Sequence, residues 1–177
     1  MGYPELARVL RRAGVATDGA NLQDARELFR RMVFNILMDN TDDHEKNHSL
    51  LVVAPFQHGR LRLAPAYDLL PSHSGQGYQE FICGRYGRDS TLDNAMSECD
   101  AFGLTPAEAA AEVVRVVEVV NTWKLHFAQM GVSPRDIENL AQQIDGDDLL
   151  QQRTSFEPGR FVLLPGKRPR KNPFRVV

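Results

Sequence analysis

The sequence contains little that would tie it to a membrane, to secretion or to a disulfide framework. No apolar run is long enough to cross a bilayer, and the N-terminus lacks the basic-then-apolar pattern of a signal peptide. The two cysteines, Cys83 and Cys99, lie far apart and form no C-x-x-C pair, which argues against a zinc site and against disulfides. We therefore expect a cytoplasmic protein with two buried thiols and no membrane partner.

A large charge of one sign is also missing. The net charge is −2 over 177 residues, so the chain has no overall attraction for nucleic acid, and we expect no direct nucleic-acid binding. Apolar residues make up 42%, which is enough for the core of one domain. Residues 165–177 differ from the rest, because they combine basic residues with prolines and have no periodicity. We expect a domain over 1–164 and a disordered basic tail over 165–177.

Helical periodicity dominates the chain. Apolar residues recur at the i, i+3, i+4, i+7 spacing, and Thr105 and Ser133 are each followed by proline, which is typical of helix starts. The helices predicted from these signals cover Tyr3 to Arg12, Asn21 to Met38 or Asp39, Pro106 to about Gln129, and a last segment from Pro134 with a break expected at Gly146. Strands are predicted at Ser49 to Val53, Leu61 to Leu63 and Phe81 to Cys83. The order predicts an α+β fold that is mostly helical.

A wholly polar run follows directly on the apolar helix that ends near Met38. Within it, Asp42 and Asn47 have the five-residue separation found in kinase catalytic loops. In that chemistry the aspartate accepts the proton of the attacking hydroxyl, and the asparagine binds a magnesium ion. A second acid then holds the metal that bridges the ATP phosphates, and Asp68 follows the predicted hairpin where that acid is needed.

Two segments resemble those of HipA-like serine/threonine kinases. Residues 40–49 read N-T-D-D-H-E-K-N-H-S and resemble that family's N-T-D-D-H-x-K-N-x-S; residues 63–71 read L-A-P-A-Y-D-L-L-P and resemble its L-x-P-x-Y-D-L-L-P. The resemblance implies a protein-kinase-like C-terminal lobe whose small hairpin carries both loops, with ATP and Mg²⁺ as cofactors. It also implies that Asp42 is the catalytic base, that Asn47 and Asp68 bind magnesium and the nucleotide, and that Lys46 lies near the transferred phosphate.

The same resemblance implies a toxin–antitoxin setting, a HipB-like antitoxin as partner and an aminoacyl-tRNA synthetase as protein substrate. The residues before Asp42 contain no glycine-rich phosphate loop and no lysine on a strand, two features of a complete kinase. We therefore expect the C-terminal half of a kinase, inactive alone without an N-lobe. An exposed apolar rim would then favour a homodimer, or the capture of a separate N-lobe.

Two other interpretations remain open. A metal-dependent phosphohydrolase would use the acids and histidines of one short segment as a metal cluster, namely Asp39, Asp42, Asp43, His44 and His48, although such crowding is poor ligand geometry. A non-catalytic interaction module would keep the lobe without its chemistry. Within the kinase interpretation, Asp43 is a solvated or loop-capping acid and His44 braces the loop.

Overall fold

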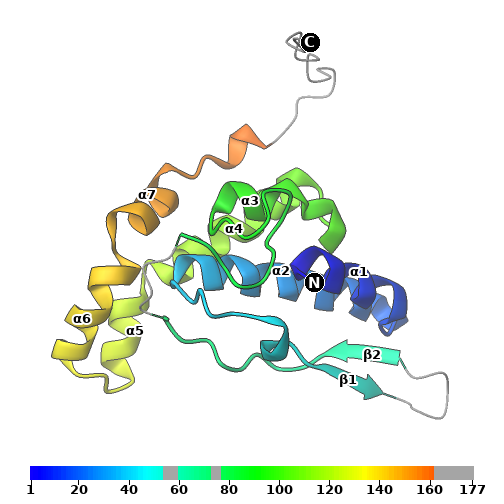
Figure 1. Cartoon of the computed structure of the whole chain (residues 1–177), viewed down its shortest axis with the longest axis horizontal. Helices are drawn as coiled ribbons and strands as arrows, with labels where there is room; N and C mark the ends of the chain where they lie inside the picture. Colours follow the sequence, from blue (N-terminus) through cyan, green and yellow to red (C-terminus); the bar gives the residue numbers. More distant parts are fainter. Residues whose placement is uncertain (54–59, 73–76, 162–177) are drawn as a thin grey trace, which may run out of the picture.

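The computed structural model describes residues 1–53, 60–72 and 77–161. It is mostly helical with a small two-stranded antiparallel sheet, as the sequence predicts (Figure 1). The predicted tail at 165–177 lies outside the described residues, as do most of the hairpin turn and of the Ser/Gly-rich segment 72–77. No helix in the described ranges is long and apolar enough to cross a bilayer. Cys83 and Cys99 are both free and buried, as expected.

Helix α2 (Ala20–Leu37) forms the centre of the core. Its buried side chains are mostly apolar, with Asp24 and Asn35 as the polar exceptions; the apolar ones are Ala25, Leu28, Phe29, Met32, Val33, Ile36 and Leu37. Helix α1 (Tyr3–Ala13) packs along α2, and the 3₁₀ turn η1 (Thr17–Gly19) connects the two helices. Gly14 permits this sharp return, because a Cβ there would lie 2.3 Å from the Leu10 carbonyl oxygen. The first turn of α1 is thereby brought against the last turns of α2.

Helices α3 (Leu92–Ser97), η3 (Cys99–Phe102) and α4 (Pro106–Val120) cover another side of α2. Phe29 and Phe102 pack edge to face with ring centroids 5.2 Å apart. Thr105 and Glu108 form the expected capping box, in which the threonine hydroxyl accepts from the Glu108 amide at 3.2 Å. These contacts give α2 an apolar neighbour on the face away from the hairpin.

The prediction of one helix from Pro106 to Gln129 is wrong. The chain breaks after Val120 and resumes as α5 (Trp123–Gln129). The amide and the hydroxyl of Thr122 both donate to the Val119 carbonyl, at 3.0 and 2.8 Å, which replaces the regular i to i−4 pattern. The indole of Trp123 donates to Asp145 at 3.2 Å and so ties α5 to the end of α6.

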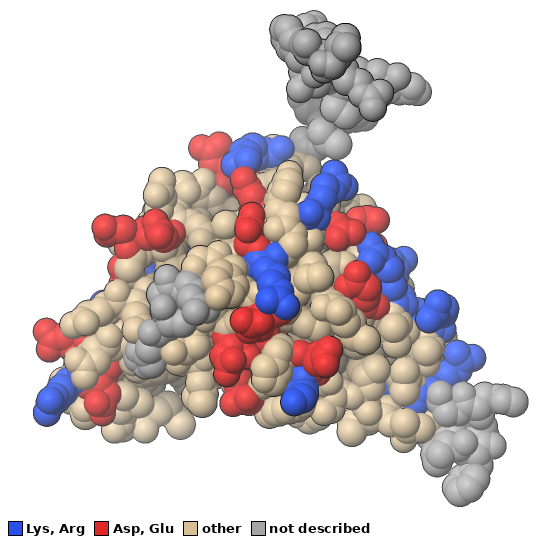
Figure 2. All heavy atoms as spheres, in the orientation of Figure 1, with Lys and Arg blue, Asp and Glu red and all other residues tan. Residues whose placement is uncertain are grey.

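The last helices divide where the sequence predicts. Helix α6 (Pro134–Ile144) stops before Gly146, helix α7 (Asp147–Ser155) follows, and the 3₁₀ turn η4 (Pro158–Arg160) ends the described part. Basic and acidic side chains are interspersed over the face shown in Figure 2.

The hairpin pairs β1 (Leu50–Val53) with β2 (Arg60–Leu63), with Leu50 opposite Leu63. Asp24 of α2 fixes it, because its carboxylate accepts from Arg62 Nε at 2.7 Å and from the Leu63 amide at 2.9 Å. The predicted strand Phe81 to Cys83 is wrong. Ile82 makes only an isolated bridge to Gly2, since its neighbour is a helix start that offers one extended residue.

Candidate active site

The motif loop begins with a defined helix end. The amide of Asn40 bonds to the Asn35 carbonyl at 2.9 Å, and that of Asp39 to the Ile36 carbonyl at 3.4 Å. This is the Schellman arrangement, which needs a left-handed residue just beyond the helix. Asp39 supplies it with a φ of 55°, a conformation that aspartate tolerates better than most residues. The turn directs the chain away from α2 and towards the polar loop.

The two neighbouring aspartates of the loop have opposite environments. Asp42 is exposed, and its carboxylate makes no hydrogen bond or ion pair with any residue that the structure describes. Asp43 is only 1% exposed and accepts hydrogen bonds from the Tyr3 hydroxyl and from His48 Nε2. The interpretation of Asp43 as a solvated acid is therefore wrong. One aspartate is available for chemistry and the other belongs to the core.

A short 3₁₀ turn, η2 (Glu45–Asn47), carries Lys46 and Asn47. His44 caps it, because its Nδ1 accepts from the Lys46 amide at 3.3 Å while the His44 amide donates to Asn47 Oδ1 at 3.1 Å. The bracing role predicted for His44 is thus seen in the geometry. Tyr67 closes the turn from outside by donating to the Lys46 carbonyl at 2.6 Å. The Lys46 side chain is exposed.

Asp68 meets Asn47 across the hairpin. The Asn47 side-chain amide donates to Asp68 Oδ2, and the Asp68 carbonyl accepts from Asn40 Nδ2 at 3.3 Å. Asp68 also has a left-handed backbone, with a φ of 57°. The contact with Asn47 holds the Asp68 side chain against the catalytic-type loop.

Three of the four predicted site residues line one cavity. Its volume is about 460 Å³, large enough for a small-molecule phosphate group and its neighbours. It is lined by Asn40, Thr41, Asp42, Asn47, Asp68, Leu70, Pro71, Ser72 and Glu80. Lys46 belongs to the same turn but is not among the lining residues.

The walls of this cavity are fixed by the backbone around Thr41. The Thr41 amide donates to Ser72 Oγ at 3.1 Å, and the Glu80 amide donates to the Thr41 carbonyl at 3.0 Å. The Ser72 amide donates to the Asp39 carbonyl at 2.9 Å. Segments that lie about thirty to forty residues apart therefore hold the loop from two directions.

The profile of the HipA-like C-terminal domain family matches residues 1–123. The chain belongs to that family. No curated protein and no solved structure gave a match. The matched part of this HipA-like C-terminal domain includes α1, α2, the hairpin and every residue of the cavity. Helices α6 and α7 follow the matched part.

Several residues of the HipA-like site were not predicted. Tyr3, Asn35 and Asn40 are almost fully buried and bond to one another or to site residues. A signal for Asn35 was present, since it occupies a core-facing position of α2 one helical turn from Met32. Burial raises the pKa of the Tyr3 hydroxyl, and the adjacent Asp43 carboxylate raises it further. Tyr3 therefore stays protonated and remains a donor at neutral pH.

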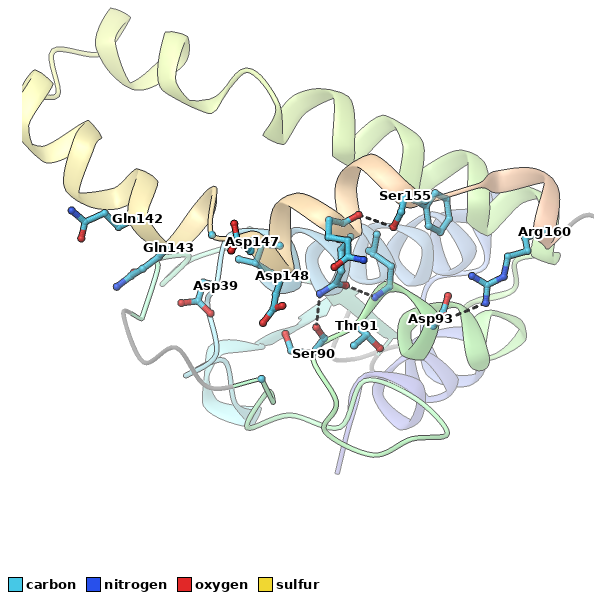
Figure 3. Close-up of a pocket in the computed structure, with 17 residues that line it drawn as sticks. Asp39, Ser90, Thr91, Asp93, Gln142, Gln143, Asp147, Asp148, Ser155 and Arg160 are labelled. Carbon is cyan, nitrogen blue, oxygen red and sulfur yellow. Dashed lines mark hydrogen bonds and ion pairs between the residues drawn. The ribbon is translucent and has the colours of Figure 1, made fainter.

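A larger cavity of about 830 Å³ lies between the α6–α7 corner and residues 90–93 (Figure 3). Three of its four acidic side chains have structural roles. Asp93 pairs with Arg160 at 3.0 Å, and Asp147 and Asp148 occupy the first turn of α7, where negative charge stabilises a helix. This cavity contains none of Asp42, Asn47 and Asp68.

The geometry gives no support to the metal-cluster interpretation. Among the described residues there is no group of three or more histidine, cysteine, aspartate and glutamate side chains placed to hold a metal ion. Asp42 and Asp43 point to different environments, and His48 is committed to Asp43 at 3.0 Å. The acids and histidines that crowd this segment of the sequence therefore do not converge on one point in space.

Proposed function

We propose that this HipA-like C-terminal domain supplies the catalytic loop and the magnesium-binding loop of an ATP-dependent serine/threonine protein kinase. The observation that carries the proposal is the common cavity of Asp42, Asn47 and Asp68. These three residues come from two separate loops, and their side-chain types are those that phosphoryl transfer requires. Membership of the HipA-like family supports the same assignment.

Asp42 is suited to orient the attacking hydroxyl. Its carboxylate is exposed, lies on the cavity wall and has no partner among the described residues, so a substrate hydroxyl would meet no competitor for it. The neighbouring Asp43 cannot take this role, because its side chain is buried on the other side of the loop. In this role Asp42 accepts the proton as the hydroxyl attacks the terminal phosphate.

Asn47 and Asp68 have the chemistry of a magnesium site. Mg²⁺ prefers hard oxygen ligands and keeps several waters, so one carboxylate and one amide oxygen suffice when phosphate oxygens complete the shell. The two side chains are in contact through the Asn47 amide nitrogen, while Asn47 Oδ1 accepts from the His44 amide, so a shared ion would have to displace the Asn47–Asp68 hydrogen bond. A bound magnesium ion would neutralise the charge that develops on the phosphates.

Lys46 is proposed to contact the transferred phosphate from the rim. Its main chain is held at both ends, by the His44 ring and by the Tyr67 hydroxyl, while its side chain is exposed. A long cationic side chain on a fixed turn can reach an anion at the cavity mouth with little loss of backbone freedom.

We propose that a glycine-rich, lysine-bearing N-lobe covers the cavity and encloses ATP in the cytoplasm. Leu70 lines the cavity and is 66% exposed, so it offers an apolar contact for such a lobe. Leu51 and Val52 of β1 are 48% and 60% exposed but lie on opposite faces of the strand, so they do not form one patch. A HipB-like antitoxin as regulator and an aminoacyl-tRNA synthetase as substrate remain proposals that follow from the family alone.

The test is phosphate transfer by the chain combined with the N-terminal lobe of a HipA-type kinase. Transfer of labelled phosphate from ATP to a protein serine or threonine is expected, and it should require Mg²⁺. Asp42→Asn provides the inactive control. A combined protein that binds ATP–Mg²⁺ but labels no more than this control would reject the kinase. Failure even to bind ATP–Mg²⁺ would favour the interaction module.

A further inference from the structure

The two loops of the site are joined by a ring of hydrogen bonds that runs through the core. From Tyr3, the hydroxyl donates to Asp43 Oδ2 and accepts from Asn35 Nδ2 at 2.9 Å. The Asn35 side-chain oxygen accepts from Asn40 Nδ2 at 3.1 Å, and the same amide group reaches the Asp68 carbonyl at 3.3 Å. Asp68 thus connects back to Tyr3 through two asparagines.

The other half of the ring runs through the catalytic loop. Asp43 Oδ2 bonds to His48 Nε2 at 3.0 Å, which requires the hydrogen on that nitrogen when the imidazole is neutral. His48 follows Asn47 in the chain, and Asn47 bonds to Asp68. The circuit therefore closes on Asp68, and it includes the residues on both sides of the proposed magnesium position.

Rigid packing surrounds this circuit. The ring of His48 stacks on Phe81 with centroids 5.1 Å apart and an interplanar angle of 24°, while Tyr3 packs edge-on against both. Tyr3 is also pinned through its amide, which donates to the Ile82 carbonyl at 2.9 Å. Gly2 allows that approach, because a Cβ would lie 2.5 Å from the Ile82 Cβ. The tyrosine hydroxyl consequently has little freedom to move.

Two buried polar atoms of this circuit lower the stability of the fold. Asp43 Oδ1 and His48 Nδ1 are buried and have no hydrogen-bond partner among the described residues. Buried polar atoms without partners destabilise a fold, and local exceptions of this kind gather at functional sites. A carboxylate, an imidazole and a phenol in a core that apolar side chains could fill therefore call for a role other than packing.

We infer that Tyr3, with the buried Asp43–His48 pair, is a positioning residue for phosphoryl transfer. This inference rests on the proposed kinase function. Holding Asp43 inside the core turns its neighbour Asp42 outward to the cavity. The Asn35–Asn40 branch meanwhile fixes the backbone of Asp68, so one hydroxyl on α1 holds the orientation of the base and of the metal ligands together.

The decisive variant is Tyr3→Phe, which removes one oxygen and keeps the aromatic packing. Tyr86→Phe is the matched control, since Tyr86 is 60% exposed and does not line the cavity. Both would be assayed in the chain combined with a HipA-type N-lobe. We expect Tyr3→Phe to lower kcat by roughly 10- to 100-fold with the KM for ATP changed less than about twofold, because small misplacement of reacting groups is costly. Tyr86→Phe should match the wild type.

A merely structural role predicts a different result. Tyr3→Phe would then lower Tm and the folded fraction, while kcat per folded molecule would match the wild type, and that outcome overturns the inference. A second pair of variants, Asp43→Asn and Asp43→Ala, keeps the test informative if Tyr3→Phe fails to fold. In Asp43→Asn the amide oxygen can take the place of Oδ2 and accept from both Tyr3 and His48, so its kcat should exceed that of Asp43→Ala by at least about tenfold. Equal kcat values for this pair would also overturn it.

The failure of the proposed function has its own signature. A wild-type protein with an N-lobe that transfers no phosphate, at the level of Asp42→Asn, rejects the kinase and the positioning role with it. A wild-type protein that transfers phosphate no faster than Tyr3→Phe rejects the positioning role alone.

Discussion

The side-chain amide of Asn47 donates a hydrogen bond to Oδ2 of Asp68, a residue 21 positions further along the chain. The β1–β2 hairpin between them sets this meeting, and the Ala64 amide extends its pairing by donating to the Ser49 carbonyl at 3.0 Å. A slip of one residue in the strand register would turn the side chains to opposite faces. The proposed metal site therefore depends on the hairpin register as much as on its two side chains.

Magnesium should bind at Asn47 and Asp68 only when nucleotide phosphates complete its shell, because two protein ligands are few for an ion that loses water reluctantly. Calorimetric titration of the chain joined to an N-lobe should show tight Mg²⁺ binding with ATP and none without it. Asp68→Asn should weaken ATP–Mg²⁺ binding by about 10- to 100-fold. Asparagine is the better test than alanine, since it tolerates the φ of 57°.

The control for the metal prediction is Asp89→Asn, because Asp89 is also an exposed aspartate but lies outside the cavity. Its affinity for ATP–Mg²⁺ should equal that of the wild type. Tight Mg²⁺ binding without nucleotide that persists in Asp68→Asn would contradict the proposed site.

The two adjacent aspartates should respond differently to the same isosteric change. Asp42→Asn should lower kcat by about 10²- to 10⁴-fold and leave Tm unchanged, because the carboxylate is exposed and has no partner among the described residues. Asp43→Asn should cause a smaller loss of kcat together with a lower Tm, since that side chain is buried. Steady-state kinetics and thermal unfolding of both variants decide the matter; a reversed order would move the catalytic role to Asp43.

The 177-residue polypeptide by itself should fold but not turn over ATP. Its α2-centred core is continuous, and unfolding should be cooperative. The cavity, however, is open, with Asp42 and Asp68 exposed to water, and phosphoryl transfer relies on electrostatics in an enclosed site. ATP consumption by the purified polypeptide should equal that of its Asp42→Asn variant. Turnover clearly above that control would mean that the ATP site is complete in these residues.

The Arg30–Glu112 pair predicts a pH dependence of stability. Arg30 donates to both carboxylate oxygens of Glu112, at 2.8 and 3.2 Å, and these bonds lower the pKa of Glu112 below its usual 4.5. A lowered folded-state pKa means that the stabilisation is present above pH 4.5 and is lost as the pH falls through the folded value. At pH 7, Glu112→Gln should lower the unfolding free energy by about 1–3 kcal/mol.

Thermal unfolding from pH 7 to pH 3 measures that effect. The difference in Tm between wild type and Glu112→Gln should be largest at pH 7 and shrink as the pH falls below 4.5. Glu118→Gln on the same helix is the control, since Glu118 is exposed, and it should follow the wild type at every pH. A Tm difference that grows in acid would contradict the assignment.

Local signals predicted much of the fold. The periodicity of α2 located its ends to within a residue or two, and the Thr105 capping box located the start of α4. The break at Thr122 was missed, because it depends on one hydroxyl competing for a backbone carbonyl in a sequence that otherwise favours helix. The Phe81 to Cys83 segment was misjudged for the opposite reason: its composition favours a strand, but among the described residues no strand lies beside it to pair with.

The candidate site could be predicted only in part. The spacing of Asp42, Asn47 and Asp68 indicated that they act together, and they do line one cavity. The spacing to Asn47 singled out Asp42, but the burial of Asp43 was not visible in the sequence, because it depends on Tyr3, which lies 40 positions away from Asp43. Contacts of that range depend on how α1 returns along α2, and no local pattern encodes them.

Asp39 and Asp68, the two left-handed aspartates of the motif loops, should tolerate different substitutions when a library of all single substitutions is selected for activity. The backbone alone constrains each position towards glycine, asparagine and aspartate. At position 39, where the Schellman turn is the requirement, glycine should survive selection. At position 68, where the side chain is proposed to hold the metal, the glycine variant should fold and yet be eliminated by the selection. Whether glycine is tolerated therefore distinguishes a position that requires only a left-handed backbone from one that requires its carboxylate.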